Sequence, residues 1–211
     1  MAVDPIASSC SENFDSAESG SETSEELDPL ITCRICIDDI EIFAVGVCNH
    51  VTCFKCIVRL RYKMNNLNCP YCREELNDVY LSKTAKEYGE FSKRSSNYNK
   101  RYQVYLPKNE SADIMEHLRA LTSWKCVDCP DTTFNHFNQW TLHQSREHKL
   151  FPCDLCTEKE ALFPSEIKLY DRSGRARHKN EEHPMCEFCD VKFYNKDELY
   201  RHLRKQHEYC R

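Results

Sequence analysis

The sequence is poor in glycine and in continuous apolar segments. Only four of its 211 residues are glycine, 40% are apolar, and the mean hydropathy is −0.71. The longest wholly apolar stretch, Ile42 to Cys48, is far too short to cross a bilayer, and the N-terminus is acidic where a secretory signal would be basic. We therefore expect no membrane partner, a reducing cytoplasmic compartment, and a fold that a hydrocarbon core alone does not hold together.

Basic residues are absent from the first 28 positions. Residues 1–28 contain eight acids and seven serines but no Lys or Arg, within a chain whose formal net charge is −5. Such a segment cannot bury enough apolar surface to offset the entropy of the chain, so the sequence predicts a disordered acidic Ser/Glu-rich tail over 1–28. The tail either solvates the chain or binds a partner.

Cysteine, in contrast, is abundant. The chain has 15 cysteines and nine histidines, and six cysteine pairs have the spacing Cys-x2-Cys, where chance would give about one. In a reducing compartment such pairs are metal ligands more often than disulfides. They fall into two blocks, separated by a basic and aromatic connector over 81–123.

The connector has its own periodic pattern. Tyr102, Val104 and Leu106 alternate as in a short strand, while Ile114 and Leu118 recur at helical spacing downstream. We expect Ser111 to cap that helix, Leu121 to continue its apolar face, and the connector to pack on a neighbouring block.

The N-terminal block holds eight ligands for two tetrahedral zinc ions with no open position, as in structural zinc sites. Consecutive pairing would join His50 and Cys53 across only two residues, which is a strained closure. The sequence therefore predicts two interleaved sites, the first formed by Cys33, Cys36, Cys53 and Cys56, and the second by Cys48, His50, Cys69 and Cys72.

These residues, from Cys33 to Arg73, resemble a C3HC4 RING domain, which we place over 29–80. The resemblance implies a RING-type E3 ubiquitin transferase that works through an E2 enzyme without a covalent intermediate. It also implies that Ile35, Leu60 and Pro70 bind E2, with Leu60 on a helix of about 54–64, and that Arg73 bridges E2 and ubiquitin in the catalytic complex. The alternatives are a purely structural Leu60 and a solvated surface Arg73.

The C-terminal block contains three further Cys-x2-Cys pairs, each followed by His-x4-His. They predict C2H2 fingers over 124–149, 150–184 and 185–208, and Cys210 would begin a truncated fourth finger at 209–211. The second finger has 21 residues between Cys156 and His178, an insert that must fold as an extra element. The predicted ligands are Cys126, Cys129, His143, His148, Cys153, Cys156, His178, His183, Cys186, Cys189, His202 and His207.

The predicted fold is thus a set of small zinc-stabilised α+β modules, a cross-brace RING followed by ββα-type C2H2 fingers, with about five Zn(2+) ions in all. Only four residues join His148 to Cys153 and two join His183 to Cys186, which disfavours a DNA-tracking array. RNA binding is favoured by basic residues interleaved with tyrosines; a solvated charged face is the alternative. The candidate RNA-binding residues are Lys93, Arg94, Lys100, Arg101, Arg175 and Arg177.

As a whole, a RING followed by closely spaced C2H2 fingers, one with a long insert, resembles the eukaryotic RING-plus-C2H2 E3 ubiquitin ligases that sense collided ribosomes. The likeness spans about 31–210 and includes the segments 183–189 and 197–204. It implies transfer of ubiquitin from E2 to small-subunit ribosomal proteins on stalled ribosomes, with the ribosome and its RNA as partners. The rival interpretations are a non-catalytic RNA-binding zinc-finger scaffold and, less favoured, a DNA-binding regulator.

Overall fold

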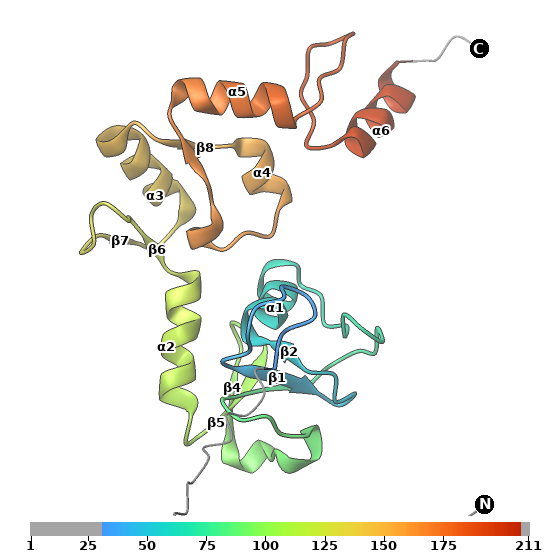
Figure 1. Ribbon diagram of the computed structural model, residues 1–211, viewed down its shortest axis with the longest axis vertical. Helices are drawn as coiled ribbons and strands as arrows, with labels where there is room; N and C mark the ends of the chain where they lie inside the picture. The colour runs from blue at the N-terminus through green and yellow to red at the C-terminus, as the bar shows by residue number, and fades with distance from the viewer. Residues whose placement is uncertain (1–30, 208–211) are drawn as a thin grey trace, which may run out of the picture. The chain divides into compact units, whose positions relative to one another are not determined.

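The computed structural model describes residues 31–207 (Figure 1). The predicted acidic tail over 1–28 and the predicted start of a fourth finger at 209–211 lie outside the described residues. Within residues 31–207, no helix combines the length and the apolar character needed to cross a membrane.

A five-stranded sheet with the strand order β2-β1-β3-β5-β4 organises the first part of the described chain. Its β5 strand runs parallel to β3, with Tyr105 opposite Tyr80, while the other pairs are antiparallel. The connector therefore adds two strands to the sheet of the RING block, and the boundary expected at residue 80 falls inside β3. The strands are β1 (Phe43–Gly46), β2 (Thr52–Cys53), β3 (Val79–Ser82), β4 (Ser96–Asn99) and β5 (Val104–Pro107).

One helix follows β2 directly, where the sequence predicts a helix over about 54–64. It begins as α1 (Phe54–Val58) and continues as a π-helical turn, η1 (Arg59–Lys63). Phe54, Ile57 and Val58 are buried in the core, whereas Met64 after the turn is 55% exposed. The apolar face of this helix thus packs inward, as its spacing predicts.

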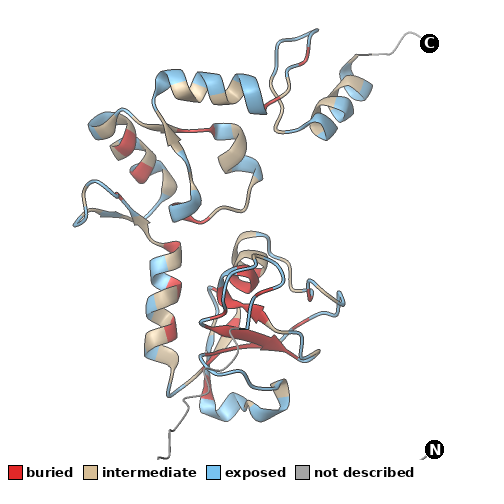
Figure 2. Ribbon diagram, viewed as in Figure 1, coloured by how far each residue is buried: buried red, intermediate tan, exposed pale blue. Residues whose placement is uncertain are grey.

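Helix α2 (Ser111–Thr122) packs on the same core through Ile114 and Leu118, which are fully buried. The Tyr102 hydroxyl lies 2.8 Å from Oγ1 of Thr122 and so ties the loop before β5 to the end of α2. Figure 2 shows buried residues concentrated on the strands and on one side of α2. Two 3-10 turns, η2 (Tyr88–Glu90) and η3 (Lys93–Ser95), precede β4.

A buried arginine joins these elements. Arg61 is only 1% exposed, and its guanidinium donates to the carbonyl oxygens of Leu76 (2.7 Å), Gln103 (2.8 Å) and Asn77 (3.3 Å). Burial lowers the pKa of Arg61 because the charged form loses solvation. The turn η1 is thereby attached both to the segment before β3 and to the loop before β5.

Three smaller units follow α2. The first two have a two-stranded sheet each, whereas the third has only an isolated bridge between Met185 and Lys192. The elements of the first unit are β6 (Trp124–Lys125), β7 (Thr133–Phe134), α3 (Phe137–His143) and the π-helical turn η4 (Gln144–His148). Those of the second are β8 (Phe151–Pro152), α4 (Asp154–Lys159), η5 (Pro164–Glu166), β9 (Leu169–Tyr170) and α5 (Arg172–Glu182), and the third has α6 (Lys196–Gln206).

The long insert of the second unit carries α4 and η5 between its two strands. Phe163, just before η5, is fully buried in the same apolar cluster as Leu81 and Leu118. The guanidinium of Arg59 lies 5.2 Å from the centre of the Phe163 ring and also pairs with Glu166. The insert therefore packs against the RING helix and is part of the main core.

Candidate metal centres

The two ligand sets of the RING block are brought together in the interleaved arrangement that the spacing predicts. Within each set the four candidate ligand atoms lie within 4.8 Å of one another. In the first, Sγ of Cys36 and Sγ of Cys53 are 3.6 Å apart; in the second, Sγ of Cys69 and Nδ1 of His50 are 3.7 Å apart. A tetrahedron with zinc–sulfur bonds of about 2.3 Å has an edge of about 3.8 Å, so both sets fit zinc.

The backbone around these cysteine pairs follows one repeated turn. Ile37, Arg73 and Asp190 each follow the second cysteine of a pair, and their φ angles are 65°, 64° and 57°. The amide of each donates to the carbonyl of the pair's first cysteine, at 2.7, 2.9 and 2.9 Å respectively. A residue in the left-handed backbone conformation closes each turn. Glycine usually fills such a position, so each of these non-glycine residues destabilises the turn by about 1 kcal/mol.

Burial and mutual contact shift the pKa values of the clustered RING thiols. Burial raises the pKa of Cys36 to about 11 and that of Cys48 to about 12, whereas hydrogen bonding from the neighbouring Cys56 thiol lowers the pKa of Cys53 to about 5. The same pairing raises the pKa of Cys56. Adjacent thiolates repel one another, and a divalent cation among them removes that penalty.

In the first finger the structure brings Cys126, Cys129, His143 and His148 together, with Nε2 of His143 and Nε2 of His148 3.3 Å apart. Histidines five positions apart do not share one face of a regular α-helix, but the π-helical turn η4 aligns them. His136 occupies the cap position of α3 and lies outside this set. Trp140 is buried in the core of this finger and donates from Nε1 to the Lys125 carbonyl at 3.0 Å.

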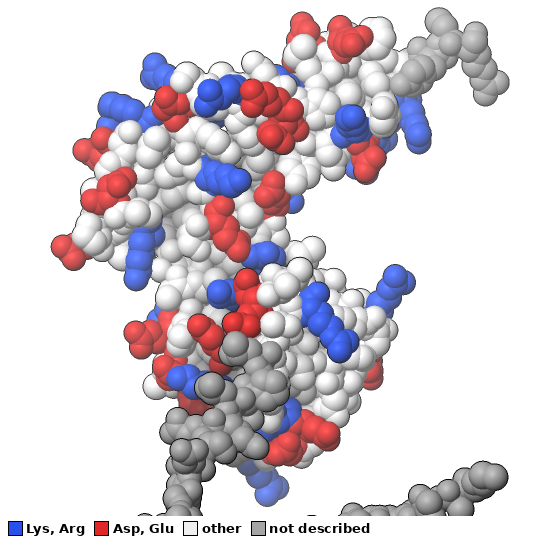
Figure 3. Space-filling model, viewed as in Figure 1, with Lys and Arg blue, Asp and Glu red and all other residues white. Residues whose placement is uncertain are grey.

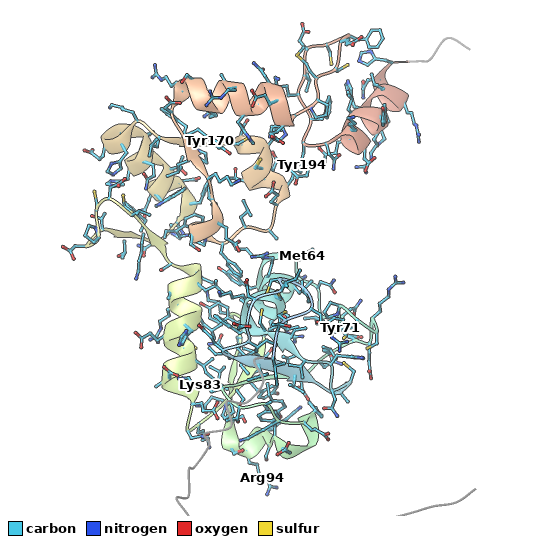
Figure 4. The ribbon with its side chains drawn as sticks, viewed as in Figure 1. Met64, Tyr71, Lys83, Arg94, Tyr170 and Tyr194 are labelled. Carbon is cyan, nitrogen blue, oxygen red and sulfur yellow. The ribbon has the colours of Figure 1, made fainter. Side chains whose placement is uncertain are left out.

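The second finger assembles Cys153, Cys156, His178 and His183 despite its insert. Sγ of Cys153 lies 3.3 Å from Nε2 of His183, and Sγ of Cys156 lies 3.4 Å from Nε2 of His178. The Tyr170 ring, labelled in Figure 4, stacks on His178 with their centres 4.8 Å apart. The insert thus supplies a neighbour that orients one of the candidate ligands.

The third finger brings together Cys186, Cys189, His202 and His207. Sγ of Cys186 and Nε2 of His207 are 3.4 Å apart, and Sγ of Cys189 and Nε2 of His202 are 3.3 Å apart. Phe193 lies against His202 with ring centres 4.6 Å apart. Five clusters in residues 31–207 could therefore each hold a zinc ion.

The expected E2-binding positions lie on the RING surface to different degrees. Ile35 is 43% exposed and Pro70 is also exposed, whereas Leu60 is half-buried and packs partly against the core. Arg73 is exposed on its left-handed turn. Sequence reasoning missed Ile37, which is 81% exposed two residues after Ile35; its apolar character at a turn position was the available signal.

The candidate RNA-binding residues of the connector are divided by the structure. Lys93 pairs with Asp78 at 2.6 Å, and the Arg101 guanidinium donates to the Tyr62 hydroxyl at 3.1 Å. Lys100 is exposed, and Arg94 points away from the body of the chain in Figure 4. Lys83, labelled in the same view, pairs with Asp113 of α2.

The cross-braced ligand sets, the sheet and the following C2H2 clusters define a RING domain joined to zinc fingers, which is the predicted fold class. Residues 28–117 match the family model described as the ZNF598 RING finger domain. This match extends well beyond residue 80, in agreement with the shared sheet.

The chain is also similar to curated E3 ubiquitin-protein ligases. It is 31% identical to ZNF598 of Homo sapiens over 188 residues, which are 84% of this chain and 20% of that protein. It is 30% identical to ZNF598 of Danio rerio, over 90% of this chain and 21% of that protein. It is 28% identical to hel2 of Schizosaccharomyces pombe, over 100% of this chain and 30% of that protein. The chain is thus similar to the ZNF598 and Hel2 ligases, in line with the resemblance seen in its sequence, and spans about a fifth to a third of their length.

Proposed function

We propose that this chain is a RING-type E3 ubiquitin ligase that promotes transfer of ubiquitin from an E2 enzyme to lysines of small-subunit ribosomal proteins on stalled ribosomes, in the cytoplasm. The observation that carries the proposal is the pair of interleaved four-ligand sets with Arg73 exposed directly after the last cysteine. The relatives are named E3 ubiquitin-protein ligases, which supports the ligase activity.

The residues around the two RING ligand sets have different roles. Zinc, when bound, holds the two loops that carry Ile35 and Pro70 in a fixed shape, because four ligands leave no open position for chemistry. Ile35 and Pro70 then offer apolar contacts to E2. Leu60 contributes the part of its side chain that the core leaves exposed.

Arg73 is the residue we assign to ubiquitin positioning. Its left-handed backbone turns the side chain out from the zinc loop, and the guanidinium can donate to carbonyl groups of two proteins at once. Restricting a flexible thioester conjugate to an attack-ready geometry lowers the entropic part of the barrier, so no covalent intermediate on this chain is needed.

The test is discharge of a purified E2–ubiquitin thioester onto free lysine by the zinc-loaded chain. We expect clear stimulation, a loss of about tenfold or more in Ile35→Ala and Arg73→Ala, and partial activity in Arg73→Lys. Val127→Ala is the matched control, because Val127 is an exposed apolar residue on a cysteine loop of the first finger, outside the RING. No stimulation by the unmodified chain with any member of an E2 panel would favour the non-catalytic scaffold.

Ribosome binding is the second part of the proposal. We assign it to the fingers and the basic residues Lys93, Arg94, Lys100, Arg101, Arg175 and Arg177, whose contacts with phosphates would release counterions. The chain should therefore co-sediment with ribosomes at low salt and dissociate as salt rises. Sedimentation that is absent, or that does not respond to salt, would contradict this part.

A further inference from the structure

Two adjoining hollows lie beside α5 of the second finger. One, of about 370 Å³, is lined by Phe151, Arg172, Arg175, Ala176 and Lys179. The other, of about 600 Å³, shares Phe151 and Arg172 and adds Ser145, Lys149, Asp171 and Ser173. The two hollows meet at Phe151 and Arg172, and we call the pair the Phe151 groove.

The basic residues of the groove stand on one face of α5. Arg172, Arg175 and Lys179 are spaced i, i+3 and i+7, so their side chains leave the helix in the same direction. The guanidinium carbons of Arg172 and Arg175 lie 5.9 and 5.8 Å from the centre of the Phe151 ring. Both guanidinium groups therefore lie close to the half-buried aromatic ring.

The charges in the groove are only partly compensated. Lys179 pairs with Asp154 at 2.5 Å, but within residues 31–207 neither Arg172 nor Arg175 has an ion-pair partner. The one acid lining the groove, Asp171, caps α5 by accepting from the Gly174 amide and the Ser173 hydroxyl. Two guanidinium groups thus remain available to an anion.

Acidic and basic residues are interspersed over the face drawn in Figure 3. In the connector, Lys83 and Lys93 are each paired with an aspartate. Anion binding that depends on unpaired cations in a hollow is therefore favoured at the Phe151 groove over the connector.

We infer that the Phe151 groove binds single-stranded RNA, with a phosphodiester held by Arg172 and Arg175 and an unpaired base stacked against Phe151. Guanidinium groups bind phosphate oxygens in pairs, and aromatic and guanidinium planes both stack on bases. An unpaired base is required, because the stacking faces of a duplex are already occupied. The inference rests on the proposed function, and it assigns the RNA contact of the second finger to the Phe151 groove.

Lys55 and Arg119 provide a matched control outside the fingers. They are exposed on α1 and α2, and they line neither hollow. Replacing both with Gln changes the net charge as much as replacing Arg172 and Arg175, so a difference between the two double variants reports position and not charge.

The experiment measures binding of a fluorescein-labelled 12-nucleotide unstructured RNA to the zinc-loaded full chain by anisotropy, at several salt concentrations. We expect Arg172→Gln/Arg175→Gln to weaken binding about tenfold or more and to reduce the steepness of the log–log salt dependence by about 0.7 for each phosphate that the variant no longer neutralises. Phe151→Leu should weaken binding about fivefold or more because the base has no ring to stack on. Lys55→Gln/Arg119→Gln should bind within about twofold of the unmodified chain, with zinc content and circular dichroism unchanged in all variants.

Three outcomes would overturn the inference. They are an equal effect of Lys55→Gln/Arg119→Gln, an unchanged affinity in Arg172→Gln/Arg175→Gln, and competition by polyglutamate as strong as that by unlabelled RNA, which would indicate an acidic peptide. E2–ubiquitin discharge measured on the same variants separates the two proposals. If the unmodified chain stimulates discharge but the groove variants bind RNA normally, the groove assignment alone fails; if discharge is absent, the ligase proposal fails whatever the RNA result.

Discussion

Nδ1 of His183 in the second finger lies 3.1 Å from the carbonyl oxygen of Tyr194 in the third. A proton on Nδ1 that is donated to this carbonyl leaves Nε2 free to face Cys153 and Cys156. The Tyr194 hydroxyl also donates to Glu160 of the second finger at 3.0 Å (Figure 4 labels Tyr194). The two fingers therefore share a support for one candidate metal ligand.

This shared support predicts that the second and third metal sites are coupled. Cys189→Ser should unfold the third finger, remove the Tyr194 carbonyl from His183 and lower the zinc affinity of the second site about tenfold. A competitive chelator titration followed through the His183 ring signals measures the effect. Cys129→Ser in the first finger is the control, and an equal loss of affinity in both variants would contradict the coupling.

The buried Arg61 predicts a large and specific loss of stability. Arg61→Met keeps the length of the side chain but leaves the carbonyls of Leu76, Gln103 and Asn77 without their donor, so we expect the free energy of unfolding to fall by about 3 kcal/mol. Arg61→Lys should also destabilise, since one ammonium group cannot reproduce the planar fork. Denaturant unfolding of the zinc-loaded chain tests both. Lys55→Met, on the exposed side of α1, should change little; a similar destabilisation there would contradict the assignment.

Phe163 predicts that the insert of the second finger stabilises the RING core. Truncating this fully buried ring in Phe163→Ala should cost about 3 to 4 kcal/mol, measured by denaturant unfolding with zinc present. Leu162→Ala, at the half-buried neighbouring position, should cost less than about 2 kcal/mol. An equal loss of unfolding free energy in the two variants would show that Phe163 stabilises the chain no more than Leu162, which would contradict the prediction.

The shared sheet predicts how far the chain unfolds when metal leaves the RING. Cys72→Ser removes a candidate ligand of the second RING set, and β5 pairs with β3 of the same sheet. Amide hydrogen exchange should therefore accelerate at Val104 and Leu106 as well as at Leu81. Protection that persists in β5 while β3 exchanges freely would show that the connector folds independently.

Much of the candidate site could be predicted from the sequence because metal ligands are restricted in both type and spacing. Loop closure alone favoured the interleaved pairing of Cys33 with Cys53 and of Cys48 with Cys69, and the structure groups these residues in the same way. The helical spacing of Ile114 and Leu118 likewise predicted α2. In both cases the residues that determine the structure lie close together in the sequence, or a short loop between them restricts how they can pair.

The remaining features depend on contacts between distant residues, which leave little local signal. The parallel pairing of β5 with β3 is not encoded in either strand alone, and β4 (Ser96–Asn99) is too polar to suggest a strand. Phe163 was visible as part of an insert, but its packing site lies about a hundred residues away on Arg59 and its neighbours. Arg61 gave no signal of burial because a basic residue on a helix is usually solvated.

The most direct test of the account is the number of zinc ions bound by the reduced 211-residue chain, measured by native mass spectrometry together with thiol alkylation. The account predicts five ions per chain, all of the clustered cysteines protected from alkylation until a chelator is added, and the loss of one ion in a single-site variant such as Cys156→Ser. Markedly fewer ions, or cysteines joined to one another as disulfides, would contradict it.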